Sequence, residues 1–311
     1  MLEVCALVSH HHLGTSFGAP ASDWLNVITP AEGRPGHYGA TLCVDQNHPY
    51  FFDHPLDHVP GMLLVTGLLD LLRGHAVLSR DHRVRLSLEF TKMCELGPGV
   101  GLSADPSDER GKWTVLALQE DRPVCTGTIT LTEEPRSEPR EEQGPDVSAA
   151  PIEKGLAHRA DPRNVLIGDP TISRDGERAG SHEEYVVPLV SPPVGHFLLR
   201  HGNEHYGLEE MIEAGRQFAT AASHLAHERP RDAVMLWLRL TADLPAAPPR
   251  AERLTLRWPT QPPRGNRGTF DLTVSRGTAT GRGEPIGSLS YGSRALSPAS
   301  YQRIRQNGEQ E

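Results

Sequence analysis

The chain has 311 residues and a formal net charge of −9 at pH 7, with a moderate apolar content. That length is enough for two domains, each with a sizeable buried core. The negative charge argues against nucleic acid as a partner, because non-specific binding needs a basic surface. It also argues against docking on an anionic membrane.

Membrane, secretory and disulfide signals are all missing from the sequence. No apolar stretch is as long as a transmembrane helix. Residues 1–8 lack the basic start and the long apolar run of a secretory signal, so we expect a cytoplasmic protein. The four cysteines form no Cys-x-x-Cys pair, which predicts neither a disulfide framework nor a thiolate zinc site.

Residues 1–132 are expected to form one module. A strand over residues 37–45 is followed by a histidine-rich turn and by a helix over residues 60–73. This helix has almost no polar face, so it should be buried on most sides. Pro60 suits its first turn and Gly74 its exit. Three strands are predicted after it, the last two as a hairpin: 82–92, 112–120 and 123–132.

Residues 133–155 differ in composition from the segments on either side. They are rich in Glu, Pro and Ser and have no apolar period, so they cannot bury a core. This composition predicts an exposed linker. Because the flanking segments are similar in length, an internal repeat is expected.

Residues 156–296 give the same order of signals. A strand over residues 183–190 precedes a second histidine-containing turn and a helix over residues 208–226 with one apolar stripe. The strands predicted next are 233–242, 253–258 and 269–275, with a weaker candidate at 285–291. Residues 297–311 are polar and are expected to form a frayed tail.

This order of elements sets the fold class. One apolar helix between an early strand and a later run of antiparallel strands is an α+β plan. A sheet that wraps round such a helix buries it on several sides. Two copies in one chain can pair edge to edge, which leaves fewer open strand edges. We therefore predict two antiparallel sheets in tandem, each wrapped round a central helix.

The turns before the two helices share the pattern His-x-x-acid-His. The offset between the copies is 147 residues for both histidines. A chance repeat of five residues at the same place in the element order is improbable, so the pattern indicates a duplication. The copies are His54, Asp57 and His58 in the first turn, and His201, Glu204 and His205 in the second.

Residues 51–64 resemble the hallmark segment of the A-factor biosynthesis hotdog family, the γ-butyrolactone autoregulator synthases of actinomycetes. That family has two hotdog repeats over about this length, so the resemblance implies a tandem double hotdog. The family's Glu-Ala-x-Arg-Gln helix is matched by residues 213–217. More distantly, the family resembles hydroxyacyl-carrier-protein dehydratases. There, a histidine before one helix and an acid on the paired module's helix share a site.

The two halves depart from this pattern in opposite ways. The position eight residues after the second histidine is Thr66 in the first half and Glu213 in the second. If the modules pair as in dehydratase dimers, His54 or His58 faces Glu213, and the second turn faces Thr66. We expect one competent site and one degenerate site.

The expected site could move a proton beside a thioester carbonyl. Histidine as a residue type titrates near neutrality, so His54 and His58, with Asp57 beside them, could act as base and then acid. The amides of Gly61 and Met62 at the helix start can hydrogen-bond a thioester oxygen as charge develops. Gly61 also lets an acyl group approach the backbone closely.

Burial should raise the pKa of Glu213, which would suit a general acid. No thiol or serine lies in an evident nucleophile setting, so direct acyl transfer or proton chemistry is favoured over a covalent acyl-enzyme. No cofactor is expected.

The resemblance implies transfer of a β-ketoacyl group from an acyl carrier protein, or a CoA thioester, to a hydroxylated acceptor such as dihydroxyacetone phosphate. Arg73 and Arg216 are candidate phosphate-binding residues, and Thr66 is grouped with the substrate-binding residues. The sequence carries no signature of an oligomeric state.

Simpler roles compete with these assignments. The histidines could bond backbone carbonyls in a tight turn, or ligate zinc, although no third ligand is evident and no metal is expected. Glu213 lies off the apolar stripe of its helix and could be a solvated acid. The activity could instead be that of a dehydratase, lyase or cyclase on a carrier-bound chain. A non-catalytic acyl-ligand binding protein is a further alternative.

Overall fold

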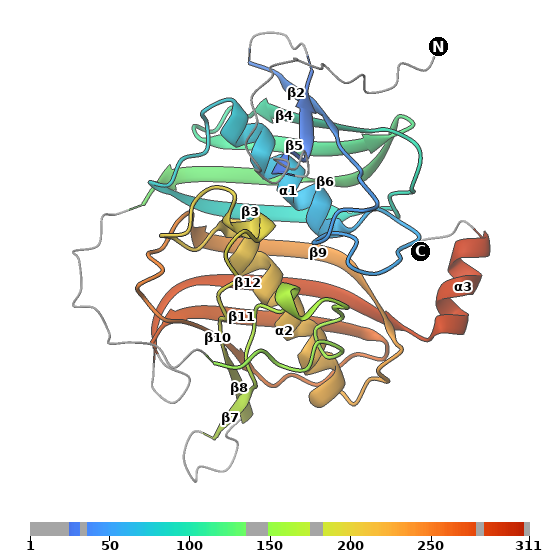
Figure 1. Ribbon diagram of the computed structural model, residues 1–311. Coiled ribbons are helices and arrows are strands. Elements are labelled where there is room, and N and C mark those ends of the chain that lie inside the picture. Colours follow the sequence, from blue (N-terminus) through green and yellow to red (C-terminus); the bar gives the residue numbers. More distant parts are fainter. Residues whose placement is uncertain (1–24, 32–35, 135–148, 175–182, 278–282, 308–311) are drawn as a thin grey trace, which may run out of the picture.

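The computed structural model describes residues 25–31, 36–134, 149–174, 183–277 and 283–307. Within them, twelve antiparallel strands form one continuous sheet in the order β1-β2-β4-β5-β6-β3-β9-β12-β11-β10-β8-β7 (Figure 1). The strands of the first half are β1 (Ile28–Pro30), β2 (Tyr38–Leu42), β3 (His82–Phe90), β4 (Val100–Pro106), β5 (Lys112–Gln119) and β6 (Arg122–Glu133). Those of the second half are β7 (Thr171–Arg174), β8 (Glu183–Pro188), β9 (Val234–Pro245), β10 (Leu254–Pro259), β11 (Arg267–Arg276) and β12 (Glu284–Leu296).

The two halves repeat one topology. Read outward from the middle of the sheet, the first half runs β3, β6, β5, β4, β2, β1 and the second runs β9, β12, β11, β10, β8, β7. Each strand therefore has a counterpart at the same place in the chain order of the other half. The duplication indicated by the two histidine turns thus extends to the whole architecture, and the two expected sheets are joined into one.

The seam between the halves is the antiparallel pair β3–β9. Leu88 lies opposite Leu240 in its register, and both side chains are fully buried. Next to them, Leu86 lies opposite Ala242. Cross-strand apolar pairs of this kind stabilise a sheet. The seam therefore carries core packing as well as backbone hydrogen bonds.

One helix lies against each half of the sheet (Figure 1). Helix α1 (Gly61–Gly74) packs on β2, β4 and β5, and helix α2 (Leu208–Leu225) packs on β9, β12 and β11. Gly67 allows the close approach of α1, since a Cβ there would lie 2.6 Å from Leu42 Cδ1 and 2.7 Å from a methyl of Leu102. Neither α1 nor α2 is long and apolar enough to cross a bilayer, and the same holds for every helix in the described part of the chain.

Strand β4 was not expected from the sequence. Val100, Leu102 and Ala104 are buried along it, so the alternation of a half-buried strand is present. Gly101 lies between them and Asp105 follows Ala104; both residue types disfavour strands, and this composition hid the pattern.

The expected linker and tail also differ from the structure. Residues 135–148 of the linker lie outside the described residues, but Ile152 is buried and its amide bonds to Ile167 O at 2.9 Å. The end of the linker is therefore packed against the second half. The tail expected to be frayed contains helix α3 (Pro298–Asn307), and Tyr301 on it is buried. The polar composition gave a wrong prediction here, because the buried aromatic side chain of Tyr301 anchors the helix.

The seam yields a stability prediction. Leu88→Ala should lower the free energy of unfolding by about 2–5 kcal/mol, because it removes buried methyl groups and leaves a cavity opposite Leu240. Chemical denaturation measures this change. Ser87→Ala, on the exposed face of the same strand, is the control and should change it by less than about 0.5 kcal/mol. Equal stabilities of the two variants would contradict the role given to the seam.

Candidate active site

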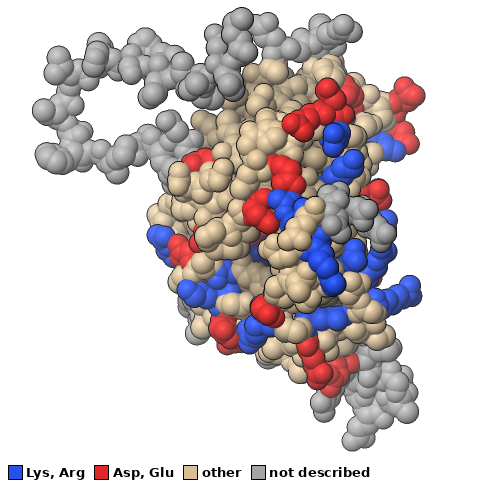
Figure 2. Space-filling view, turned by 90° about the vertical axis from the view of Figure 1, so that its right-hand side faces the viewer, with Lys and Arg blue, Asp and Glu red and all other residues tan. Residues whose placement is uncertain are grey.

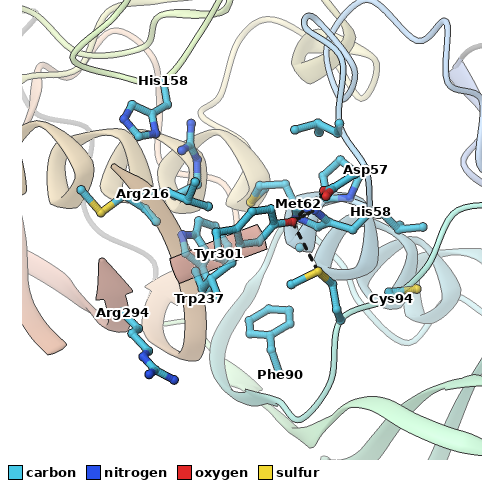
Figure 3. Close-up of a pocket in the computed structure, with 18 of the residues that line it drawn as sticks. Asp57, His58, Met62, Phe90, Cys94, His158, Arg216, Trp237, Arg294 and Tyr301 are labelled. Carbon is cyan, nitrogen blue, oxygen red and sulfur yellow. Dashed lines mark hydrogen bonds and ion pairs between the residues drawn. The ribbon is translucent and has the colours of Figure 1, made fainter. Parts of the chain in front are cut away.

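A cavity of about 920 Å³, here called the main cavity, is lined by residues of both halves (Figure 3). The first half contributes residues 54–62 and 90–94, which are the histidine turn, the start of α1 and the segment at the end of β3. The second half contributes residues 158–160, 231–238 and the side chains of Glu213 and Arg216 on α2. Helix α3 supplies a further wall.

The main cavity gathers most of the residues singled out in the sequence. They are His54, Asp57, His58, Gly61, Met62, Glu213 and Arg216. Arg73 and Thr66 are not among its lining residues. A histidine of the first half and an acid of the second half therefore share one cavity, as the pairing of modules predicted.

Each histidine of the first turn pairs with the aspartate before it. His58 Nδ1 lies 2.8 Å from Asp57 Oδ1, and His54 Nδ1 lies 2.6 Å from Asp53 Oδ1. A carboxylate accepts the Nδ1 hydrogen, which leaves Nε2 with a lone pair that can accept a proton. Burial alone would raise the pKa of Asp53, but the His54 hydrogen bond and the charge of Arg159 outweigh it and lower this pKa to about 2.

Tyr301 reaches the same turn from α3. Its hydroxyl donates to Asp57 Oδ1 at 2.7 Å and lies 3.3 Å from His58 Nδ1. Figure 3 shows this hydroxyl in the middle of the cavity wall, next to Asp57 and His58. No pattern in the polar tail marked this residue.

Glu213 is fully buried, so the interpretation as a solvated acid is wrong. Its carboxylate accepts hydrogen bonds from Arg159 Nη2 at 2.6 Å, Arg216 Nε at 2.8 Å and Gln217 Nε2 at 2.7 Å. Burial raises the pKa of Glu213, but the two guanidinium groups and the hydrogen bonds lower it further, to about 2. The expected raised pKa is therefore also wrong, and Glu213 is ionised at neutral pH.

Arg159 joins the two halves at this point. Besides Glu213, it donates to Tyr50 O at 2.8 Å, lies 3.7 Å from Asp53 Oδ1 and covers the Tyr50 ring with its guanidinium carbon 4.8 Å from the ring centroid. It thus holds the histidine turn of the first half against α2 of the second. Sequence analysis missed Arg159, because one arginine in a loop of an arginine-rich chain carries no motif.

Arg216 is the candidate phosphate ligand that does line the main cavity. Its Nε and Nη2 bind Glu213, and Nη2 also donates to Ala157 O at 3.1 Å. Its guanidinium carbon lies 5.9 Å from the centroid of a Trp237 ring. Arg216 therefore balances the charge of Glu213 and presents a cationic edge to the cavity.

His158 is a second cavity-lining residue that the sequence analysis missed. Its Nε2 lies 2.8 Å from His224 Nε2, and His224 Nδ1 lies 2.9 Å from Arg229 O. A carbonyl only accepts, so His224 Nδ1 donates to it, His224 Nε2 accepts, and His158 Nε2 donates. Burial, with help from the charge of Arg216, lowers the pKa of His158 to about 3. His158 is therefore neutral, with its Nδ1 free to accept a hydrogen bond.

The counterpart of the main cavity in the other half is smaller, and charged side chains line it. This second cavity, of about 300 Å³, is lined by Arg73, His201, His205 and Glu209 among others. Arg73 binds Glu209 through both terminal nitrogens, at 2.5 and 2.8 Å, and Arg200 donates to the same carboxylate at 2.8 Å. Glu209 stands 147 residues after Met62, so an ion-pair cluster occupies the place of an apolar cavity wall.

Two of the substrate-binding assignments, Arg73 and Thr66, do not lie at the main cavity. The guanidinium of Arg73 is committed to Glu209 and to Asp70 at 2.8 Å, so it does not reach the main cavity. Thr66 is fully buried within α1. Thr66 is not among the described residues that line the second cavity, so the expectation of one competent and one degenerate site stays a prediction.

Asp70, His201 and Glu209 offer ligand atoms within 4.8 Å of one another, a spacing that a metal ion could accept. Both carboxylates, however, are bound by Arg73 and Arg200. Two guanidinium groups supply the positive charge that a cation would bring. The arrangement therefore fits an ion-pair network better than a metal site.

A continuous antiparallel sheet with two central helices, and a cavity shared by its two halves, defines a double hotdog protein. The chain matches the family model AfsA, the A-factor biosynthesis hotdog domain, over residues 22–133 and 141–296, and it belongs to that family. The 2-oxo-3-(phosphooxy)propyl 3-oxoalkanoate synthase of Streptomyces virginiae is 32% identical over 81 residues. That match covers 26% of this chain and 27% of the synthase, or about a quarter of the relative's length.

Solved structures show the same fold at low sequence identity. A putative thioesterase II from Thermobifida fusca is 20% identical with a TM-score of 0.52, covering 89% of this chain and 98% of that one. The dehydratase domain of RzxB from Pseudomonas fluorescens is 12% identical with a TM-score of 0.53, covering 85% and 96%. These likenesses concern the fold alone.

The buried carboxylate yields a pH prediction. The folded pKa of Glu213, about 2, is below its ordinary value of 4.5, so its ionised form stabilises the fold. This contribution is fully present above about pH 4.5 and is lost as the pH falls towards 2. Urea unfolding between pH 6 and 2 should therefore show a steeper loss of stability in the wild type than in Glu213→Gln.

The control for this comparison is Glu204→Gln, at an exposed acid of the second turn. This variant should keep the wild-type slope. Parallel slopes for wild type and Glu213→Gln would contradict the assignment of an ionised Glu213.

Proposed function

We propose that this protein transfers a β-ketoacyl group from an acyl carrier protein, or a CoA thioester, to the hydroxyl of a small phosphorylated acceptor such as dihydroxyacetone phosphate. The observation that carries the proposal is His58, held by Asp57 at 2.8 Å beside the start of α1 in a cavity made by both halves. The name of the Streptomyces virginiae relative describes the synthesis of an ester of this kind.

His58 is the proposed base. Its Nε2 takes the proton of the acceptor hydroxyl as that oxygen attacks the thioester carbonyl carbon. A C–O bond forms, the C–S bond breaks, and the leaving sulfur takes the proton back from the imidazolium. His54, with its own aspartate partner, is the alternative base on the same turn. We favour His58 because it is nearer in the chain to the helix start that would bind the oxyanion.

The start of α1 is suited to the developing negative charge. The first amides of a helix have no intrahelical acceptor, and the helix dipole favours an anion there. Gly61 and Met62 are these residues, and both line the main cavity. Their amides would hydrogen-bond the carbonyl oxygen as the tetrahedral intermediate forms.

Cationic side chains near the main cavity suit a phosphorylated ligand. Lys92, Arg231 and Arg294 line the cavity together with Arg216. On the face where α3 lies, Lys and Arg side chains gather over the middle and lower parts, although the chain as a whole is acidic (Figure 2). They would bind a phosphate of the acceptor or of the thioester donor.

The dehydratase alternative fits the site less well. A dehydratase of this type needs a protonated acid beside its substrate, and Glu213 is ionised and held by Arg159 and Arg216. Incubation of the protein with a β-ketoacyl thioester, with and without dihydroxyacetone phosphate, tests the proposal by mass spectrometry. Ester formation that depends on the acceptor supports transfer. Water loss from a β-hydroxyacyl thioester without acceptor would support the dehydratase instead, and binding without turnover a ligand-binding protein.

Loss of the proposed base should abolish most of the activity. We expect His58→Ala to lower kcat by about 10²–10⁴-fold, because general-base catalysis contributes that much. His205→Ala, the same change at the equivalent position of the second turn, is the matched control and should keep kcat within about twofold. Acyl transfer at wild-type rate in His58→Ala would contradict the proposed role of His58.

An aromatic pair should limit the acyl chain. The rings of Phe90 and Trp237 meet edge to face at 5.9 Å, and both press on the start of α1, where a Cβ on Gly61 would lie 3.3 Å from Trp237. Trp237→Ala should therefore shift the ratio of kcat/KM values towards longer acyl thioesters, by about tenfold for a few added methylenes. Trp113→Ala, on β5 and outside the cavity, should leave that ratio unchanged. A wild-type chain-length profile in Trp237→Ala would show that the pair does not bound the acyl site.

A further inference from the structure

Helix α3 follows the family domain but forms part of the main cavity. The family match ends at residue 296, and α3 begins at Pro298. Figure 1 shows α3 to one side of the sheet, beyond the end of β12. The residues that it places on the cavity are Pro298, Tyr301, Gln302 and Ile304. One wall of the site is thus supplied from outside the residues that match the family model.

Tyr301 is the anchor of α3. Its side chain is 6% exposed, although the helix around it is polar. The buried hydroxyl donates to Asp57 Oδ1 at 2.7 Å, the oxygen that also accepts from His58 Nδ1. Asp57 therefore has two donors on one oxygen, and the carboxylate that holds the imidazole of His58 is itself held by Tyr301.

Arg305 ties α3 to the same turn one helical turn later. Its terminal nitrogens bind Glu95 at 2.5 and 2.7 Å, and its Nε lies 3.2 Å from Asp57 Oδ2. It also donates to Asp57 O at 3.0 Å. Arg305 thereby bridges the histidine turn and the segment after β3, which are already paired through His58 and Glu95.

These contacts keep Asp57 ionised. Burial raises the pKa of Asp57, but the hydrogen bonds from His58 and Tyr301 and the charge of Arg305 outweigh it and lower this pKa. An ionised Asp57 accepts from His58 Nδ1, so Nε2 stays the proton acceptor. Other groups facing this pair are Met93 Sδ, 3.5 Å from the Tyr301 hydroxyl, and Glu95.

We propose that Tyr301 is a positioning residue for His58. We also propose that α3 is part of the active site and is held against the histidine turn by Arg305. The proposal rests on His58 as the base of the proposed function. Tyr301 acts through Asp57: it fixes the carboxylate that fixes the imidazole. It also limits how strongly Asp57 can hold a protonated His58, because it competes for the same oxygen.

The test compares three variants of the full chain. Tyr301→Phe removes the hydroxyl and keeps the ring in the cavity wall. Arg305→Gln removes the ion pairs that Arg305 makes with Glu95 and Asp57. Arg303→Gln is the matched control, because Arg303 is exposed on the same helix and donates only to Ser300 Oγ at 3.1 Å among the described residues. The measurements are kcat and KM against pH with a β-ketoacyl thioester and dihydroxyacetone phosphate, and the ¹⁵N NMR signals of the His58 ring.

We expect Tyr301→Phe to lower kcat about tenfold with KM within about twofold, the size of one lost hydrogen bond to a charged group. Because Asp57 would then bind the imidazolium more tightly, the acid limb of the kcat profile should move to higher pH. Arg305→Gln should move it in the same direction, since a nearby positive charge is removed. Arg303→Gln should match the wild type.

The two readouts separate this proposal from the proposed function. Altered His58 ring signals in Tyr301→Phe and Arg305→Gln, and not in Arg303→Gln, support the positioning role even if no thioester is turned over. Turnover that needs His58 but is identical in wild type and Tyr301→Phe, with unchanged ring signals, would overturn the positioning role and leave the proposed reaction standing.

Discussion

The pairing of β3 with β9 decides where the functional side chains lie. It places the two central helices in one molecule with their starts on opposite sides of the seam, so the histidine turn of the first half meets α2 of the second. Leu88 and Leu240 bury this junction. Without it, the modules that carry His58 and Glu213 would not share a cavity. The main cavity depends on that junction as much as on the residues that line it.

Across the seam, the buried charge of Glu213 holds the halves together. An unpaired carboxylate at this depth would take up a proton, but Arg159 and Arg216 keep it ionised. Arg159 also binds the backbone beside the histidine turn, at Tyr50 O. The acid thus holds two cations beside the histidine turn, and in the proposed function proton transfer falls to the imidazoles. This division of roles distinguishes the site from one in which an acid and a histidine both exchange protons with the substrate.

Local sequence patterns predicted much of the fold and part of the candidate site. The repeat offset pointed to His54 and His58, and the family resemblance of residues 213–217 pointed to Glu213, because both signals lie in short runs of adjacent residues. Arg159 and Tyr301 were not predicted, because their contacts form only when segments that are distant in the sequence pack together. The pKa of Glu213 was misjudged for the same reason: its position on a helix is local, whereas Arg159 approaches it from the segment after the linker. Helices and strands can be predicted from the periodicity of nearby residues. The pKa of a buried group depends on charged side chains that come close only in the folded structure.

The ion-pair cluster beside the second cavity makes the two halves of the chain differ. Arg73, Arg200, Asp70 and Glu209 bind one another there, and Glu209 stands at the position that corresponds to Met62 of the first half. These ion pairs join α1 to the second half. Under the proposed function, the main cavity takes the acyl ligand and the second does not, so the expected stoichiometry is one ligand per polypeptide despite the repeated topology of the sheet.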